Sequence, residues 1–403
     1  MTDYTQLITN KTIDELMELL DSEQLHLNQP DPTGKTLLFH AVKENNLALA
    51  KALLDKGADP NVREETMLTP WLFAGSNGLH DMLKLMTAYQ PKLDDANRFG
   101  GTALIPSSEK GFLATVLVAI EAGVPVNQQN SLAWSALQEA AILGNESFLF
   151  TEIIKVLLKH GADVSLTDFD DKTALDWAKE HHHTHIVDLL ENGLPSDSSS
   201  QTVSQAVYDG HYDQAMMLIS EHPTAENAFW KGFIHELQGD YHSALKTYEA
   251  ALTTYEDDQF LFYKANALRK LKQPTEALAA FDLAIERHPE TFFYLYHKSN
   301  YLRELGRHED AVEAMNQLLA KEPDRYDYLF HKANSLRSLG RHEEAVEAMK
   351  QASKASPANP LYPFNQAQSY VLLNQKDEAR EILNHILAKG SFIQAETLLE
   401  ELQ

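Results

Sequence analysis

Cysteine is absent from the 403-residue sequence. Its absence excludes disulfide bonds, thiolate nucleophiles and cysteine-ligated zinc, and it is consistent with a reducing compartment. The N-terminal segment lacks a basic start followed by an apolar run, so we expect no signal peptide. No apolar stretch approaches the length of a membrane span. We therefore predict a cytoplasmic protein that has no membrane partner.

Positive charge is also scarce. The chain has 34 Lys and Arg against 59 Asp and Glu, and its formal net charge is −25 at pH 7. A surface this acidic repels phosphate backbones, which argues against nucleic acid as a partner. Hydrophobic residues make up 43% of the sequence, which is enough to build a core and argues against a disordered chain.

Motifs typical of catalysis are missing as well. The sequence contains no G-x-x-x-x-G-K-[ST] phosphate loop, no H-E-x-x-H zinc helix and no G-x-S-x-G nucleophile elbow. A histidine run stands at His181, His182, His183 and His185. Adjacent histidines point in different directions, and no cysteine or carboxylate at a fixed spacing completes a metal shell. We predict no enzyme, no catalytic residue, no cofactor and no functional metal site; the sequence leaves adventitious binding by the run undecided.

What the sequence does contain is repetition. The decapeptide GRHEDAVEAM at 306–315 returns as GRHEEAVEAM at 340–349. Its first alanine recurs at intervals of 33 and then 34 residues, at Ala244, Ala277, Ala311, Ala345 and Ala379. Mostly turn-permissive residues stand five positions earlier, at Gly239, Gln273, Gly306, Gly340 and Asn374. Prolines that stop a helix follow twelve positions after the middle three alanines, at Pro289, Pro323 and Pro357. Each unit therefore predicts a helix, a tight turn, a second helix and a stop.

Two further sets of residues keep the same register. Small residues recur where the two helices would cross, at Gly232, Ala265, Ser299, Ala333 and Ala367. Larger apolar residues recur on the second helix, at Tyr248, Phe281, Met315, Met349 and Leu383. This pattern resembles the tetratricopeptide repeat over roughly residues 200–403. A shorter unit with Ala215 precedes Ala244, and SFIQAETLLEELQ at the end resembles a polar capping helix.

The first half has another period. Equivalent helix-capping residues stand 33, 33, 33 and 38 positions apart, at Thr36, Thr69, Thr102, Ser135 and Thr173. The units end in LLDKGADPN, AIEAGVPVN or LLKHGADVS, in which a glycine ends the second helix in a left-handed conformation. These landmarks resemble the ankyrin repeat, and NRFGGTALIP and SLAWSALQEA are similar to a bacterial group of ankyrin proteins. Met67, Ala133 and Asp171 replace the finger glycines Gly34 and Gly100, so we expect irregular fingers there.

The two resemblances imply an all-α chain made of two consecutive α-solenoids. We expect an ankyrin-repeat domain at 1–195, with about six units including a degenerate N-terminal cap. A linker follows at 196–201, within a Pro- and Ser-rich stretch. A tetratricopeptide-repeat domain of about six units and a C-terminal capping helix fills 202–403. The ankyrin fingers contribute a few β-bridges at most.

The tetratricopeptide resemblance implies a concave groove lined by positions 5, 9 and 12 of each first helix, counted from 19 residues before the repeated alanine. The middle three repeats place there an aromatic ladder, an asparagine ladder and an arginine ladder: Phe262, Tyr296 and Phe330; Asn266, Asn300 and Asn334; Arg269, Arg303 and Arg337. We predict that the arginines bind an acidic peptide or an exposed carboxylate. The aromatic residues would pack its apolar parts, and the asparagines would bind its backbone.

Each ladder also has a structural alternative. The aromatic residues and asparagines would then only stabilise helix stacking, and the arginines would pair with glutamates such as Glu304. The carboxylate clamp of chaperone-binding tetratricopeptide domains is expected to have a groove lysine near position 5. Here aromatic residues stand at position 5 and the lysines stand at position 7, at Lys264, Lys298 and Lys332, so the pattern differs from that clamp.

The ankyrin half offers a second candidate surface, made of Phe73, Arg98, Phe99, Trp134, Phe148 and Phe150. Aromatic residues and arginine are typical interface anchors. Trp134 would alternatively pack over the neighbouring finger. The five extra residues of the 38-residue spacing, Glu146–Phe150, are expected to lengthen the loop between two helices or to extend a helix, without breaking the stack. In an exposed loop their apolar side chains would either fold back or touch a partner. Trp71 replaces a core leucine and is assigned to the core.

The predicted function is a non-enzymatic scaffold or adaptor of bacterial origin that binds protein or peptide partners in the grooves of the two arrays. Two alternatives share this architecture. A secreted effector would act on host proteins, and an inhibitor or immunity protein would use the negative charge to capture a basic enzyme. The sequence identifies neither the partner nor the oligomeric state.

Overall fold

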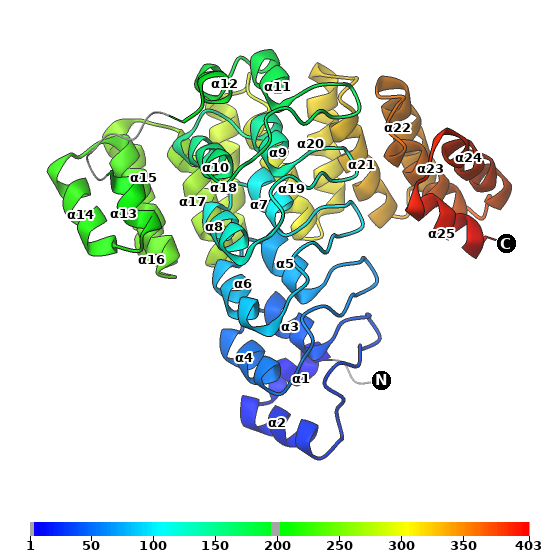
Figure 1. The fold of residues 1–403 in the computed structure, drawn as a ribbon, viewed down its shortest axis with the longest axis horizontal. Coiled ribbons are helices and arrows are strands. Elements are labelled where there is room, and N and C mark those ends of the chain that lie inside the picture. The colour runs from blue at the N-terminus through cyan, green and yellow to red at the C-terminus, as the bar shows by residue number, and fades with distance from the viewer. Residues whose placement is uncertain (1–3, 195–201, 403) are drawn as a thin grey trace. The chain divides into compact units, whose positions relative to one another are not determined.

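A computed structural model describes residues 4–194 and 202–402 of the chain (Figure 1). These residues form helices, turns and loops and contain no β-strand and no β-bridge. The prediction of an all-α chain with two successive repeat arrays is therefore confirmed, whereas the few bridges allowed for the ankyrin fingers do not form in the described ranges. The chain divides into two compact units, Met1–Asp197 and Ser198–Gln403. The linker expected at 196–201 lies outside the described residues.

The first unit stacks antiparallel helix pairs in chain order from α1 to α12 (Figure 1). Most of these helices have only six to ten residues, and the longest has twelve. Their bounds are α1 Tyr4–Asn10, α2 Ile13–Asp21, α3 Leu37–Lys43, α4 Leu47–Asp55, α5 Pro70–Ser76, α6 His80–Met86 followed by the 3-10 turn η1 Thr87–Tyr89, α7 Leu104–Glu109, α8 Leu113–Ala122, α9 Ala136–Leu143, α10 Phe148–Lys159, α11 Ala174–Glu180 and α12 Thr184–Asn192.

Four helices, each the first of its pair, have a side-chain N-cap: α3, α5, α9 and α11. The cap hydroxyls accept hydrogen bonds from the backbone N–H three residues later, and the caps are Thr36, Thr69, Ser135 and Thr173. Thr102 departs from this pattern, because Ala103 is already helical and the Thr102 hydroxyl accepts instead from Leu104 N, at 3.4 Å. The predicted left-handed glycines follow the second helices, with φ of 94° at Gly57 and at Gly123 and 84° at Gly161.

One polar side chain organises each ankyrin finger. Its oxygen accepts hydrogen bonds from the backbone N–H groups two and four residues later, at 2.8 to 3.2 Å. These finger anchors are Asp31, Glu64, Asn97, Asn130 and Asp168.

All five fingers share one backbone conformation. The residue three positions after each anchor has positive φ, and φ is 75° at Gly34 and Gly100. Met67, Ala133 and Asp171 take the same conformation, with φ of 66°, 58° and 58°. The expectation of irregular fingers was therefore wrong. The anchor hydrogen bonds hold the turn even where a side chain adds about 1–2 kcal/mol of left-handed strain.

The second unit continues with longer helix pairs, mostly of 10 to 15 residues, and ends in one extra helix. Their bounds are α13 Val203–Tyr208, α14 Tyr212–Glu221, α15 Ala225–Leu237, α16 Tyr241–Tyr255, α17 Gln259–Lys270, α18 Pro274–Arg287, α19 Phe293–Glu304, α20 His308–Lys321, α21 Tyr326–Ser338, α22 His342–Ala355, α23 Leu361–Leu372, α24 Lys376–Lys389 and α25 Ile393–Glu401.

Size complementarity holds each of these pairs together. The repeated alanines are fully buried, and so are the small crossing residues and the larger apolar residues of the second helices. The crossing is tightest at Gly232, where an added Cβ would lie 2.1 Å from the Tyr248 ring. The smallest residue is thus paired with the broadest ring, which keeps the packing dense without overlap.

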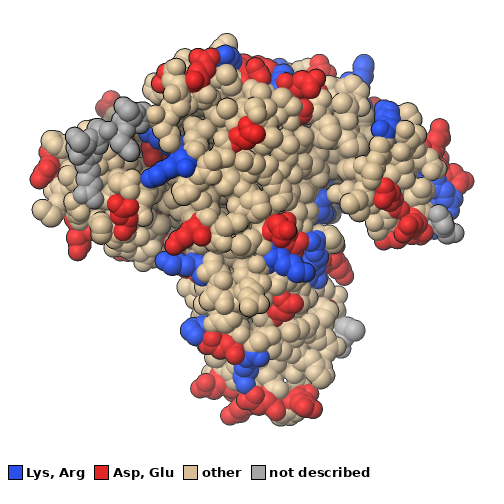
Figure 2. Space-filling model, in the orientation of Figure 1, with Lys and Arg blue, Asp and Glu red and all other residues tan. Residues whose placement is uncertain are grey.

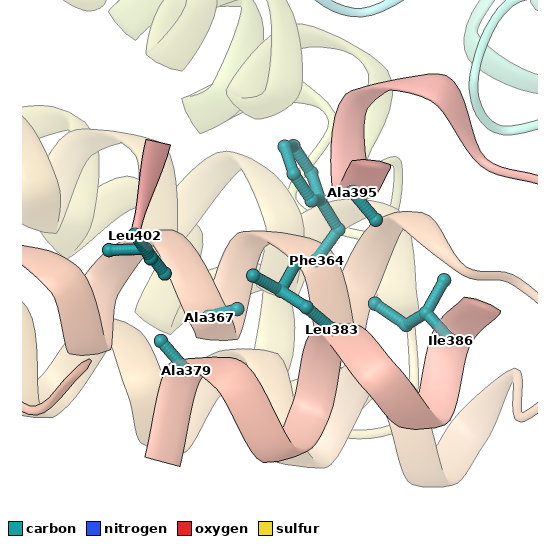
Figure 3. Close-up of a cluster of buried hydrophobic side chains, with 7 residues drawn as sticks. All are labelled: Phe364, Ala367, Ala379, Leu383, Ile386, Ala395 and Leu402. Atoms are coloured by element: carbon teal, nitrogen blue, oxygen red, sulfur yellow. The ribbon is translucent and has the colours of Figure 1, made fainter. Parts of the chain in front are cut away.

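The last helix, α25, closes the array. Ala395 and Leu402 are buried against Phe364, Leu383 and Ile386 of the preceding pair, α23 and α24 (Figure 3). Its outer face remains in solvent, with Ile393 72% exposed. A terminal repeat needs such a cover because it has no following repeat to bury its apolar face.

Candidate binding surfaces

The aromatic ladder of the second unit is buried. Phe262, Tyr296 and Phe330 are each 2–3% exposed, so they cannot pack a peptide as predicted. The Phe262 ring lies 4.9 Å from the rings of both Phe293 and His297 in the next repeat. These aromatic residues are therefore core residues that join successive first helices, because a ring at position 5 faces the next repeat and not the solvent.

The asparagine ladder is also largely withdrawn from solvent. Asn266 is 9% and Asn300 3% exposed, and Asn334 is half-buried. Asn266 Oδ1 accepts a hydrogen bond from Arg269 Nη1 at 2.9 Å. The structure therefore leaves little of Asn266 and Asn300 accessible for the predicted contact with a peptide backbone.

The three arginines at position 12, which we call the arginine row, each reach the first helix of the following repeat. Arg269 pairs with Glu304 on α19, with Nη2 2.5 Å from Oε2, as the structural alternative anticipated. Its guanidinium also lies 4.8 Å from the centre of the Tyr301 ring. Arg337 donates to the oxygens of Gln368 and Asn365 on α23, at 3.1 Å to Gln368 Oε1.

Arg303 differs from its two neighbours in the arginine row. Its Nη1 donates to Nδ1 of His331 on α21, and no carboxylate among the described residues forms an ion pair with it. Because Nδ1 accepts this bond, the His331 proton resides on Nε2, which lies 3.1 Å from the Tyr296 hydroxyl. Arg303 is half-buried and keeps its positive charge without a carboxylate partner. Burial and this charge together lower the pKa of the nearby His308.

On the ankyrin unit, the structure brings together Arg98 and Phe99, two of the six predicted surface residues. Arg98 is exposed, and its guanidinium lies 4.6 Å from the centre of the half-buried Phe99 ring. Phe73 is half-buried against Phe39, with ring centroids 5.2 Å apart. Trp71 is buried as predicted.

Trp134 is a core residue rather than a surface anchor. It is 1% exposed, and its indole N–H donates to Asp168 Oδ2 at 3.1 Å, in the next finger. Trp177 donates to the same oxygen at 2.8 Å. The alternative prediction, in which Trp134 packs over the neighbouring finger, therefore describes its position. The Asp168 carboxylate therefore joins both indole rings to the same finger.

The insert Glu146–Phe150 is mostly internal. Helix α10 begins at Phe148, and Leu149 and Phe150 are 5% and 0% exposed, so the insert extends a helix, which is one of the two predicted alternatives, and these two side chains fold back into the core. Phe148 is half-buried. Glu146 Oε1 accepts hydrogen bonds from His185 N at 2.6 Å and from the Thr184 hydroxyl at 3.3 Å. The insert therefore lengthens α10 and also caps α12, which ties two successive units together.

The histidine run lies at the turn between α11 and α12. The His181 and His183 rings meet edge to face, with centroids 5.5 Å apart. Burial is the main cause that lowers the pKa of His183, so its ring favours the neutral form. No group of three or more metal-ligating side chains is positioned to hold an ion within residues 4–194 and 202–402. Across the same ranges, no helix is long and apolar enough to cross a membrane.

Position 7 of the first helices carries a row of lysines, among them Lys264, Lys298 and Lys332. Lys264 pairs with Glu249 at 2.9 Å, and Lys298 pairs with Asp282. The equivalent Lys231 of the first full repeat was missed. It could have been found by extending the alignment at position 7 to α15. Its expected acidic partner is replaced by Ser220.

Comparison with known proteins identifies the first array. Ankyrin-repeat models match residues 33–65 and, as three copies, 108–200. The putative ankyrin repeat protein YahD of Escherichia coli strain K12 is 36% identical over 165 residues, which are 41% of this chain and 82% of YahD. The chain belongs to the ankyrin-repeat family. Its second half is a tetratricopeptide-repeat array, matched by repeat models at 237–290, 296–360 and 336–402.

Other relatives match less than half of the chain. Human inversin is 27% identical over 188 residues, which are 45% of this chain but only 17% of inversin. The crystal structure of an ankyrin repeat domain from Acinetobacter baumannii is 38% identical and covers 44% of this chain and 91% of that domain, with a TM-score of 0.43. Ankyrin and tetratricopeptide repeats are protein–protein interaction modules.

Proposed function

We propose that this ankyrin–tetratricopeptide protein is a non-enzymatic scaffold or adaptor that binds protein partners through separate surfaces on its two arrays. The observation that carries the proposal is Arg303. It holds a positive charge in the middle of the arginine row, and its hydrogen-bond partner is a neutral histidine ring. A carboxylate from a partner protein would supply the missing negative charge through a charge-assisted hydrogen bond.

The neighbouring arginines set the limits of this contact. Arg269 already has its carboxylate in Glu304, so it gains less from an added anion. The proposed contact is therefore centred on Arg303, in the α19–α21 region. The aromatic and asparagine ladders shape the groove from below and make no direct contact with the partner.

The exposed Arg98 and the adjacent Phe99 ring support a contact on the ankyrin array. A guanidinium stacked on an aromatic ring has its conformation already restricted, which lowers the entropy lost on binding. Phe99 is half-buried, so the exposed part of its ring adds apolar contact area at the tip of the finger.

One feature favours a second function, the capture of a basic partner. Acidic side chains gather over α2 (Figure 2), where Asp14, Glu15, Glu18 and Asp21 are exposed. Such a patch accelerates association with a positively charged protein and makes the rate depend on salt. An inhibitor or effector would use it in this way, and partner capture would then be lost when these acidic residues are neutralised.

The test is affinity capture from native lysate with quantitative mass spectrometry, using the wild type and four variants in parallel, one of them with the acidic residues of α2 neutralised. Arg303→Glu should lose a partner that Lys376→Glu retains, because Lys376 carries the same charge far along the second array. Arg269→Ala should retain that partner, since Glu304 already neutralises Arg269. Undiminished capture by Arg303→Glu, with an intact fold, would remove the arginine row from the function. Loss of every partner upon neutralising α2 would favour the second function.

A further inference from the structure

Helices α14, α15 and α16 enclose an open groove of about 550 Å³, which we call the lysine groove. Its floor is apolar and made of small or flexible side chains, among them Met216, Ile219, Ala228, Ala250 and Ala251. Its polar lining includes Lys231, Lys246 and His235, and no aspartate or glutamate lines it. In a chain with 59 acidic residues, a groove that carries only positive charge is an exception.

The repeat register explains why Lys231 has no partner. In the two following repeats, the position 7 lysine pairs with an acidic side chain five residues after the repeated alanine of the preceding helix. Counted from Ala215, that place in α14 holds Ser220, whose hydroxyl donates to Met217 O at 2.7 Å. Lys231 and Lys246 therefore form no ion pair with any residue of the described ranges.

The equivalent groove two repeats later is smaller. Helices α18, α19 and α20 enclose only about 220 Å³ there, and Leu295 and Leu302 are part of the lining. The lysine groove has Ala228 and His235 at the corresponding positions, so part of its lining is smaller. Asp282, Asp310 and Glu313 of the smaller groove are replaced by Ser220, Ser243 and Lys246. These replacements both widen the groove and reverse its charge.

We infer that the lysine groove receives an acidic amphipathic segment of a partner protein. The carboxylates of the segment take the place of the acidic side chains that line the smaller groove between α18, α19 and α20. The apolar side chains of the segment cover the floor of the lysine groove. The groove runs along α16 from Ser243 to Tyr255, a length of about three helical turns, which suits an amphipathic helix. Its volume is in the range of about 300–1,000 Å³ that is typical of binding pockets.

This surface is separate from the arginine row. The lining residues of α15 stand at positions 3, 4, 7 and 11 of the repeat, whereas the arginine row stands at position 12 on the face shared by positions 5 and 9. At about 100° per residue, these two faces of a first helix point in nearly opposite directions. The inference therefore does not depend on the function proposed for Arg303.

The experiment is a methyl NMR titration of the full chain. The probe is a synthetic helical peptide of about 14 residues, or about four turns, with leucines along one face and glutamates flanking them. The Met216, Ile219 and Ala250 resonances should shift on addition of the peptide, and its affinity should fall as salt rises. A counterpart peptide with lysines in place of the glutamates should bind at least tenfold more weakly.

Variants test the missing acid directly. Ser220→Glu restores the side chain that the neighbouring repeats have, so it should pair with Lys231 and weaken the acidic peptide at least tenfold. The double variant Lys231→Glu/Lys246→Glu should abolish the shifts. Lys376→Glu, which makes a charge change far from the groove, should leave the affinity unchanged. Resonances elsewhere in the second array report that each variant is folded.

Three results would overturn the inference. The acidic peptide could leave the groove methyls unshifted, it could bind no better than its lysine counterpart, or it could bind Ser220→Glu as well as wild type. Concentration-dependent shifts without any peptide would assign the groove to a second copy of this chain and not to another protein. Arg303→Glu should leave the titration unaltered, so failure of one proposal is distinguishable from failure of the other.

Discussion

The two arrays keep their repeat spacing by different physical means. In the ankyrin array, a polar side chain in each finger binds two backbone N–H groups, and the helices are short. In the tetratricopeptide array, small and large apolar residues are buried between the paired helices, and Gly232 directly faces Tyr248. Hydrogen bonds are directional and fix the conformation of a loop, whereas apolar packing fixes the distance between helices. Substitutions of one kind should therefore damage one array more than the other.

The type of each finger anchor also matches the hydrogen-bonding group that it meets nine residues later. Asp31 and Asp168, which only accept hydrogen bonds, meet the donors His40 and Trp177 nine residues later, at 2.9 and 2.8 Å. Asn130 also carries donors, and it meets the acceptor Glu139 at 2.6 Å. The donor and the acceptor thus change together, so that the buried groups stay satisfied.

Removing a finger anchor should have the largest effect. Asp168→Ala deletes a 6% exposed carboxylate that accepts four hydrogen bonds, two from backbone and two from the indoles of Trp134 and Trp177. It leaves buried donors without partners, so we expect the ankyrin array to lose about 3–5 kcal/mol. Urea unfolding followed by tryptophan fluorescence measures this loss.

The control for this variant is Asp163→Ala. Asp163 is exposed and caps a surface turn through Ser165 N at 2.9 Å. It should cost less than about 1 kcal/mol. Equal losses for the two variants would mean that the fingers do not depend on their buried anchors.

The corresponding test in the second array is Gly232→Ala. The added methyl would lie 2.1 Å from the Tyr248 ring, which is itself 1% exposed and cannot move away freely. We expect a loss of about 1–3 kcal/mol from overpacking, detected by thermal unfolding with Trp230 as the fluorescent probe. Adding Tyr248→Leu should recover part of this loss, as a double-mutant cycle would show. Strict additivity would contradict close packing at this crossing.

A third variant concerns Glu236, a half-buried carboxyl of the tetratricopeptide array with a raised pKa. Burial raises the pKa of Glu236 to about 7, and the Tyr248 hydroxyl donates to it at 2.8 Å. The folded protein holds this proton up to about pH 7, whereas the unfolded chain loses it near pH 4.5, so stability falls as pH rises between these values.

Glu236→Gln removes this pH dependence. It should stabilise the second array by about 1–2 kcal/mol at pH 8 and change little at pH 5, since one pKa unit corresponds to about 1.4 kcal/mol. Chemical unfolding at the two pH values measures the difference. An equal effect at both would assign the change to packing and not to ionisation.

The local features of both arrays were predictable from the sequence. Helix caps such as Thr36, the left-handed Gly57 and the buried Ala311 depend on residues close in the chain or on one repeat length. The exposure of ladder residues was not predictable in this way. Phe262 and Trp134 are buried by side chains of the next repeat, and a period alone does not say which of two faces that repeat covers.

The candidate binding residues show the same limit. The pairing of Arg269 with Glu304 was foreseen as an alternative, because both residues stand near the groove face in successive repeats. The role of Glu146 at the start of α12 was not foreseen, because it joins residues 39 positions apart through an insert that breaks the period. The lysine groove was missed because it is marked by an absence, that of an acid at Ser220, which only a comparison of repeats reveals.

The smallest predicted effect has the opposite sign and tests whether a finger anchor imposes strain. Ala133 is held at φ 58° by Asn130, whose side chain accepts from Leu132 N and Trp134 N. A left-handed alanine costs about 1–2 kcal/mol, and glycine avoids this cost but loses about 0.5–1 kcal/mol in chain entropy. Ala133→Gly should therefore stabilise the ankyrin array by about 0.5–1 kcal/mol, measured by urea unfolding. Ala52→Gly, inside α4, should instead destabilise it by about the same amount. If both variants lose stability alike, the finger turn at Ala133 is relaxed, and the polar anchors align the fingers without straining them.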